Sequence, residues 1–212
     1  MLEVSNLSKT YRGRTVLHPV SFTLKAGECL GIAGANGSGK STLLRILAQV
    51  EMPDSGRILF AGQDVRRDRT FPRSRLGYVP QDDALMEELT CSRQISLWQA
   101  ACGRKGPLPA GIVELMGIEG MMRRRIAELS GGMRRRLSIA LALAGEPPVL
   151  IMDEATSALD GDYCSALMDW LEQYLRRGGR IVWCSHHAEE LERLCDRCLI
   201  LRDGQSEWKN NV

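Results

Sequence analysis

The sequence has no apolar run long enough to cross a membrane. Its longest apolar stretch, Leu137 to Ala144, contains a serine, whereas a membrane-spanning helix needs about 20 consecutive apolar residues. The first residues, Met1 to Val4, also lack the basic and apolar regions of a secretory signal peptide. These absences argue against a secreted protein and against one that spans a membrane by itself, and we expect a cytoplasmic chain.

The chain also lacks a large excess of charge of one sign. Charged residues make up 25% of the sequence and the formal net charge is +2, so neither intrinsic disorder nor a basic nucleic-acid-binding surface is indicated. No internal repeat or low-complexity segment interrupts the 212 residues. A chain of this length can bury a substantial core, and we expect residues 1–212 to form one domain that contains a small subdomain.

The cysteines show no pairing pattern. There are seven, at positions 29, 91, 102, 164, 184, 195 and 198, and in a cytoplasmic protein they remain thiols. Cys195 and Cys198 have the spacing of zinc ligands, but no second pair follows them. Because a structural zinc ion needs four ligands, we favour partly buried thiols over a zinc site.

What the sequence does contain is an ordered series of strand and helix signals typical of an α/β protein. The first third alternates apolar with polar residues, a small helical segment follows at residues 82–128, and from residue 130 helices alternate with apolar strands. The expected strands are residues 2–4, 20–24, 29–33, 57–60, 76–79, 149–152, 181–184 and 198–201. The expected helices follow residue 42 and include residues 95–101, 112–116, 121–129, 132–144 and 163–176 and a segment that ends at Leu194.

Gly34 to Thr42 fits the phosphate-loop pattern of a glycine, four residues, and then glycine, lysine and serine. Glycines let the backbone curl around phosphate oxygens with its N–H groups pointing inward. Lys40 then bridges the β- and γ-phosphates, and Ser41 ligates Mg²⁺. The position between an expected strand and an expected helix favours this interpretation over a glycine-rich turn. The predicted ATP-binding residues here are Gly34, Asn36, Gly37, Ser38, Gly39, Lys40, Ser41 and Thr42.

Two carboxylates, Asp153 and Glu154, come directly after an apolar strand. In that position Asp153 can hold the Mg²⁺ that Ser41 also ligates. Glu154, one residue further, can face the attacking water as a general base. Adjacent acids at a strand end are often solvated loop residues, and the presence of the phosphate loop favours the catalytic interpretation.

Ser130, Gly131 and Gly132 precede an expected helix. A hydroxyl and two glycines at a helix start offer free N–H groups and the positive end of the helix dipole, which together form an anion site. A serine that only caps the helix is the alternative.

In this order, the motifs resemble those of an ATP-binding cassette (ABC) nucleotide-binding domain, and the likeness runs from about Leu2 to Gly204. The resemblance implies a P-loop NTPase core with an ABC-type antiparallel β subdomain and a short α-helical subdomain. Gly34 to Thr42 resembles the Walker A loop, Asp153 and Glu154 the Walker B end with the catalytic glutamate, and Ser130 to Gly132 the signature motif.

The same resemblance assigns further residues. Tyr11 resembles the aromatic residue that stacks on adenine, with an exposed aromatic near a strand end as the alternative. Gln81 resembles the glutamine that senses Mg²⁺ and the γ-phosphate, and His186, rather than the neighbouring His187, resembles the switch histidine. Asp160 ends a segment that resembles the D-loop and is also a candidate helix cap.

The sequence departs from the family pattern at two motif positions. Met133 replaces the usual glutamine of the signature motif, which puts one polar contact to nucleotide across a dimer in question. Ala155 stands where many members have proline. The helical segment is short and no C-terminal regulatory domain is expected, and both features favour a small exporter-type ATPase.

The resemblance implies a head-to-tail homodimer or heterodimer that holds two ATP molecules, with Ser130 and Gly132 of one subunit against the γ-phosphate held by Lys40 of the other. It also implies a separate transmembrane permease that keeps the chain at the cytoplasmic face of a membrane. Arginine clusters at residues 66–69, 123–125 and 134–136 keep an alternative open, a soluble ABC ATPase of DNA repair, chromosome maintenance or translation. Such proteins carry coiled coils, zinc modules or tandem cassettes, which this sequence lacks, so transport is favoured.

Overall fold

The computed structural model describes residues 1–65, 75–104 and 106–209. Its centre is a six-stranded sheet with the order β10-β9-β3-β8-β7-β6, in which all neighbours are parallel except β10 and β9. The strands are β3 (Cys29–Gly34), β6 (Leu76–Val79), β7 (Val149–Asp153), β8 (Ile181–Cys184), β9 (Arg197–Arg202) and β10 (Gln205–Lys209). The carboxyl ends of the parallel strands meet at one edge of this sheet, where α/β proteins bind ligands.

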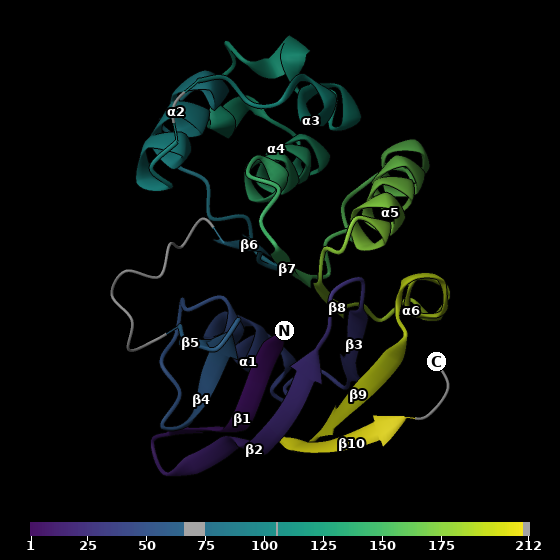
Figure 1. Ribbon diagram of the computed structural model, residues 1–212. Coiled ribbons are helices and arrows are strands. Elements are labelled where there is room, and N and C mark those ends of the chain that lie inside the picture. Colours follow the sequence, from purple (N-terminus) through teal and green to yellow (C-terminus); the bar gives the residue numbers. More distant parts are fainter. Residues whose placement is uncertain (66–74, 105, 210–212) are drawn as a thin grey trace.

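A second sheet is antiparallel and has the order β2-β1-β4-β5. Its strands are β1 (Leu2–Tyr11), β2 (Arg14–Leu24), β4 (Ser55–Phe60) and β5 (Gln63–Asp64). In Figure 1 it lies below the central sheet, on the side away from most helices. This arrangement supports the expected antiparallel subdomain.

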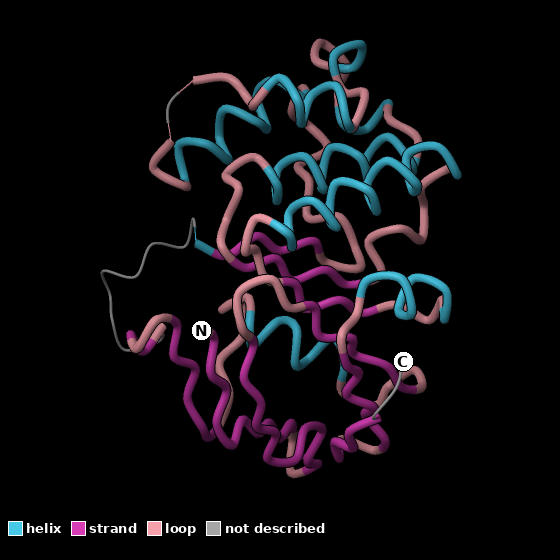
Figure 2. Tube along the Cα trace, turned by 45° about the vertical axis from the view of Figure 1, so that its right-hand side comes forward, coloured by secondary structure: helices cyan, strands magenta, loops and turns pink. Residues whose placement is uncertain are grey.

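Helix α1 (Lys40–Leu47) lies between the two sheets and contacts strands of both. The other helices pack on the opposite face of the central sheet, and Figure 2 shows this separation of helices above and strands below. They are α2 (Cys91–Ala101), α3 (Ala110–Leu115), α4 (Gly131–Leu143), α5 (Gly161–Arg176) and α6 (Ala188–Leu194), with two 3-10 turns, η2 (Glu119–Met121) and η3 (Ile126–Glu128).

Strand β7 shows how the sequence builds a core on each face of the central sheet. Leu150 and Met152 join the helices in one cluster of buried residues, whereas Val149 and Ile151 join α1 and the antiparallel sheet in the other. Alternate residues of a strand point to opposite faces, so a strand that is apolar throughout is buried on both. The central sheet therefore has a packed apolar core on each of its faces.

Most of the expected elements are confirmed, with differences that have physical causes. The helix expected at Met121–Leu129 is wrong. The chain there forms two 3-10 turns, because the backbone around Arg125 pairs with that around Thr90: the Arg124 carbonyl accepts from the Cys91 N–H at 3.0 Å and the Ile126 N–H donates to the Leu89 carbonyl at 2.9 Å. Strand β10 was not expected from the sequence, and β1 and β2 are longer than expected.

No helix among the described residues combines the length and the apolar character needed to cross a membrane. The seven cysteines are free thiols, and the sulfur atoms of Cys29 and Cys195 lie 3.5 Å apart. No group of three or more histidine, cysteine or acidic side chains is placed to share a metal ion within residues 1–65, 75–104 and 106–209. The arginine cluster at residues 66–69 lies outside the described residues.

Candidate functional site: a nucleotide cleft

The phosphate loop runs from the end of β3 to the start of α1. Gly39 caps the helix in a left-handed conformation with φ of 103°, so the first backbone N–H groups of α1 lie beside the loop without a capping side chain. The Lys40 ammonium donates to the carbonyl oxygens of Gly34 at 2.8 Å and Ala35 at 3.0 Å. A cationic side chain and a helix N-terminus thus face the same space, which is the chemistry of an anion site.

Two glycines of this loop are required by close contacts. A Cβ atom at Gly34 would lie 2.2 Å from the Leu201 carbonyl oxygen, and one at Gly39 would lie 2.6 Å from the Val16 carbonyl oxygen. Both glycines also have positive φ angles, 146° and 103°. Any side chain here would force the loop away from β9 and β2, so the loop packs closely against the strands beside it.

The loop forms one wall of a cleft with a volume of about 410 Å³. Distant segments complete it: Val16 comes from β2, Gln81 follows β6 and Glu154 follows β7. The fold therefore brings the predicted Gln81 and Glu154 to the predicted phosphate loop. The lining residues are Val16, Asn36, Gly37, Gly39, Lys40, Ser41, Thr42, Arg45, Gln81 and Glu154.

Asp153 lies at the buried end of β7 and is only 1% exposed. Burial raises the pKa of its carboxyl group, and the Ser41 hydroxyl and the Cys184 thiol, which hydrogen bond to the carboxyl, oppose that shift. Its Oδ2 atom is buried without a hydrogen-bond partner among the described residues. An unpartnered carboxylate oxygen beside a serine hydroxyl offers the hard oxygen ligands that Mg²⁺ prefers, so the residues fit the predicted ion.

Glu154 has a backbone conformation that non-glycine residues rarely adopt, with φ of 49°. Its N–H donates to the Cys184 carbonyl at 2.9 Å, and its carbonyl accepts from the Ser157 N–H at 3.1 Å. The Glu154 Oε1 atom lies 3.2 Å from Nδ1 of His186. His187, by contrast, donates its backbone N–H to the Ser185 hydroxyl. Of the two histidines, it is His186 whose ring meets the glutamate.

Ser130, Gly131 and Gly132 begin helix α4 but do not line the cleft formed by the described residues. The Ser130 hydroxyl accepts from the Met133 N–H at 3.3 Å, as in the helix-cap alternative. A Cβ at Gly132 would lie 2.9 Å from the Ala158 carbonyl oxygen, whereas one at Gly131 would meet no described atom within 4 Å. Within one chain, this helix start and the phosphate loop belong to separate surfaces.

The chain and its fold are similar to known proteins. A family model described as ABC transporter matches residues 17–157. The sequence is 36% identical over 209 residues to the Nod factor export ATP-binding protein I of Rhizobium etli, covering 97% of this chain and 66% of that protein.

The chain belongs to the ABC transporter family.

Solved structures of ABC proteins have the same fold. One is described as the ATP binding subunit of an ABC transporter; it matches with a TM-score of 0.90 and 29% identity and covers 100% of this chain and 90% of its own. Another is the dimeric bacterial ABC transporter cassette MJ0796, with a TM-score of 0.84, 25% identity and full coverage of both chains. The chain spans about two thirds of the length of the curated ABC relatives it matches.

Tyr11 of this ABC protein is not among the residues that line the cleft. It is 38% exposed, and its hydroxyl donates to the Glu51 carboxylate. Arg45, which does line the cleft, pairs with the same carboxylate at 3.2 Å between Nε and Oε2. Tyr11 is thus joined through Glu51 to a residue of the cleft wall, and adenine stacking stays a prediction.

Two other family positions have a clear structural role. The Asp160 carboxylate accepts from the Tyr163 N–H at 3.2 Å, so the expected cap of α5 is confirmed. Met133 packs against the buried helical cluster, and its sulfur accepts from the Arg124 guanidinium at 3.7 Å. A long apolar side chain suits this half-buried position, which gives the departure from glutamine a packing rationale.

Sequence reasoning missed Arg45 and Arg135. The helical spacing that places Leu43 and Leu44 in the core also puts Arg45 on another face of α1, toward the cleft. This periodicity could have identified Arg45 from the sequence. Arg135 sits in the middle of three consecutive arginines, and no local pattern distinguishes the buried one from the others.

Proposed function

We propose that this chain is the ATP-hydrolysing subunit of an ABC membrane transporter, and that it powers export through a separate transmembrane permease. The observation that carries the proposal is the convergence of Lys40, Gln81 and Glu154, from three distant segments, on one cleft. The name of the Rhizobium etli relative, an export ATP-binding protein, supports the export direction.

The cleft residues have complementary tasks in phosphoryl transfer. Backbone N–H groups from Gly37 to Thr42 and the Lys40 ammonium bind the phosphates and stabilise their negative charge. Ser41, Gln81 and Asp153 would hold Mg²⁺, which when bound neutralises charge on the β- and γ-phosphates. No protein nucleophile is needed, because positioning and charge stabilisation supply most of the catalysis.

Glu154 is the proposed general base for the attacking water. Its carboxylate borders the cleft, and the left-handed backbone at this residue turns it away from the strand direction. His186, which follows β8, contacts that carboxylate at 3.2 Å but is not among the residues that line the cleft, and we assign it to the γ-phosphate. The two side chains would therefore act on the same water and phosphate.

A second subunit would complete each site. Ser130 and Gly132 carry an anion-binding helix start that is separate from the cleft of their own chain. In a head-to-tail dimer they would close over the ATP held by Lys40 of the other subunit. The dimeric MJ0796 cassette, which shares the fold, supports this arrangement. Closure on ATP and opening after hydrolysis would deliver work to the permease.

Replacing Glu154 by glutamine tests the catalytic assignment. Glu154→Gln keeps the size of the side chain and removes proton acceptance, so we expect ATP turnover to fall by roughly 10²–10⁴-fold with ATP affinity retained. Turnover is measured as phosphate release and affinity by equilibrium titration. Glu189→Gln, an exposed change in the first turn of α6, is the matched control. Parental turnover in Glu154→Gln would contradict the assignment.

Co-purification tests the partner. A transporter subunit should be recovered with a multi-spanning membrane protein at the cytoplasmic face of the membrane. Recovery on DNA or ribosomes would instead favour the alternative, a soluble ABC ATPase of DNA repair, chromosome maintenance or translation.

A further inference from the structure

Arg135 is a fully buried arginine on α4, the helix that begins at Ser130 to Gly132. Its residue exposure is 1%, although it stands between Arg134 and Arg136 on α4. A buried guanidinium is strongly destabilising unless its donors are matched by acceptors. The contacts of Arg135 therefore show why the fold keeps a charge at this position.

One edge of the guanidinium holds the segment that follows β7. Its Nη2 atom donates to the carbonyl oxygens of Asp153 at 2.8 Å and Glu154 at 2.7 Å. Its Nε atom donates to the Ala155 carbonyl at 2.9 Å. Three consecutive carbonyls are thus fixed at the point where Glu154 adopts its left-handed conformation. Such a conformation is strained in a non-glycine residue and persists only when its surroundings hold it.

The other edge holds the segment that follows β6. The Nη1 atom donates to the Pro80 carbonyl and to Asp83 Oδ1 at 3.1 Å, with a longer contact of 3.4 Å to the Gln81 carbonyl. Asp83 supplies the ion pair that a buried cation needs. One planar group therefore joins the backbone of Gln81 to the backbone of Glu154, and both residues line the cleft.

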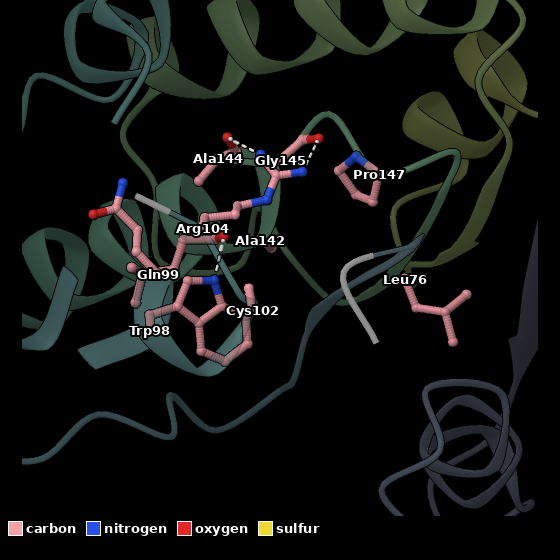
Figure 3. Close-up of a pocket in the computed structure, with 10 residues that line it drawn as sticks. Leu76, Trp98, Gln99, Cys102, Arg104, Ala142, Ala144, Gly145 and Pro147 are labelled. Atoms are coloured by element: carbon pink, nitrogen blue, oxygen red, sulfur yellow. Dashed lines mark hydrogen bonds between the residues drawn. The ribbon is translucent and has the colours of Figure 1, made fainter. Parts of the chain in front are cut away.

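The far end of α4 is fixed by α2 and the turn after it. Trp98 donates from its indole Nε1 to the Leu141 carbonyl at 2.9 Å, and Arg104 donates to the carbonyls of Ala144 and Gly145 (Figure 3). The pocket among these side chains has a volume of only about 20 Å³, room for about one water molecule and no ligand. Helix α4 is thus anchored at its last turn and, through Arg135, at the cleft.

We propose that Arg135 is a positioning residue for ATP hydrolysis: it sets the relative placement of Gln81 and Glu154 and couples both to the helix that carries Ser130 to Gly132. The inference rests on the proposed function. All three side-chain nitrogens of Arg135 donate to protein carbonyls or to Asp83, so its role is to hold other residues and not to bind nucleotide directly. Its loss acts on the rate of the chemical step rather than on ATP binding, since the phosphate loop does not contact it.

The test is Arg135→Lys in the purified full chain. Lysine keeps the charge but lacks the planar fork, so it cannot serve both segments at once. Displacement of reacting groups by about 1 Å can cost about 10²-fold in rate, and we expect kcat to fall by about 10- to 100-fold. The KM for ATP is expected to stay within about twofold of the parent value, the signature of a lost transition-state interaction. A merely structural role would lower the unfolding midpoint without this split between kcat and KM.

Arg134→Lys is the matched control. It changes the same residue type one position away, where the guanidinium pairs at the surface with Glu87 at 2.7 Å, and both kinetic constants should stay at parent values. If Arg135→Lys does not fold, the same kinetic measurement on Asp83→Asn tests the positioning role. That variant leaves Arg135 in place but removes the charge that orients Nη1, and kcat should fall by about threefold or more at unchanged KM.

Two results separate this inference from the proposed function. Parent-like kcat in folded Arg135→Lys, or in Asp83→Asn if Arg135→Lys does not fold, overturns the positioning role while the ATPase assignment stands. Absence of ATP binding and turnover in the parent chain itself overturns the proposed function, and the positioning role with it.

Discussion

The two anion-binding helix starts of this protein differ in how much of a site surrounds them. At the start of α1, the chain itself supplies a cleft of about 410 Å³ with a lysine, a glutamine and a glutamate around it. At the start of α4, Ser130 caps the helix and Gly131 has open space beside it, and the cleft lies elsewhere. The same local chemistry therefore forms a cleft lined by several segments of one chain in one place and an open helix start in the other.

The difference follows from where each helix starts. Helix α1 follows β3 through the phosphate loop and packs on the central sheet, so Gln81 after β6 and Glu154 after β7 line the same cleft as its first residues. Helix α4 begins after two 3-10 turns on the helical side, and Arg135 makes its side-chain hydrogen bonds to the segments after β6 and β7. A nucleotide bound at α1 is thus expected to meet an α4 start only from another subunit.

The largest expected effect comes from the phosphate loop that precedes α1. Gly34→Ala puts a Cβ atom 2.2 Å from the Leu201 carbonyl oxygen, so loop and strand must separate. We expect a loss of about 3 kcal/mol or more in the free energy of unfolding, together with loss of ATP binding. Urea denaturation and ATP titration measure the two effects.

Gly37→Ala is the matched comparison for that variant. Gly37 also has a positive φ, 78°, but an added Cβ would meet no described atom within 4 Å. Its cost in unfolding free energy should be limited to the left-handed conformation, about 1 kcal/mol. Equal losses in the two variants would show that the packing of Gly34 against β9 does not matter.

A second prediction addresses the open half. Gly131→Asp adds a carboxylate at the first position of α4, which the helix dipole tolerates, so the fold should be unchanged. The added charge would repel the γ-phosphate of an ATP held by another subunit. We expect ATP-dependent dimerisation to weaken by about tenfold or more, with ATP affinity of the monomer unchanged. Sedimentation of the Glu154→Gln background with ATP measures it.

Gly120→Asp is the control for added charge, because a Cβ at Gly120 likewise meets no described atom within 4 Å. If Gly131→Asp dimerised as well as the parent, Ser130 to Gly132 would not contact the ATP bound by another subunit, and the cleft of one chain would be the whole site.

The smallest expected change in stability concerns Asp153, at the end of β7. Asp153 buries a carboxylate whose Oδ2 atom has no hydrogen-bond partner among the described residues. In the presence of a chelator, Asp153→Asn should therefore stabilise the nucleotide-free protein by about 1 kcal/mol while it abolishes turnover. Urea denaturation at neutral pH checks the gain. A destabilised variant would show that this carboxylate is adequately solvated or paired without a cation.

The sequence motifs predicted the nucleotide cleft. A phosphate loop between an apolar strand and a helix is a local pattern, and Asp153 and Glu154 stand at the end of a strand that is apolar throughout. Their meeting with Gln81 followed from the parallel sheet, because the strand ends share an edge.

What the sequence left open depends on long-range pairing. Met121 to Leu129 has apolar residues that favour a helix, yet its backbone bonds to the segment around Thr90 and so forms 3-10 turns. Strand β10 is mostly exposed and forms through its partner β9. No local pattern marks Arg135, because its acceptors, backbone carbonyls and the Asp83 carboxylate, lie 18 to 20 and 52 to 55 residues away.

The choice of backbone acceptors by Arg135 has a consequence for mutational scanning. Alanine substitution of Pro80 removes a side chain but keeps the carbonyl that Arg135 binds, and Ala155 already has the smallest side chain with a Cβ. Among these loop acceptors, an alanine scan would detect the link only at Asp83, which accepts through its side chain, whereas substitution of Arg135 removes all of the donors at once. Variation at the other loop positions is compatible with a fixed connection, provided that residue 135 keeps its guanidinium and residue 83 its carboxylate.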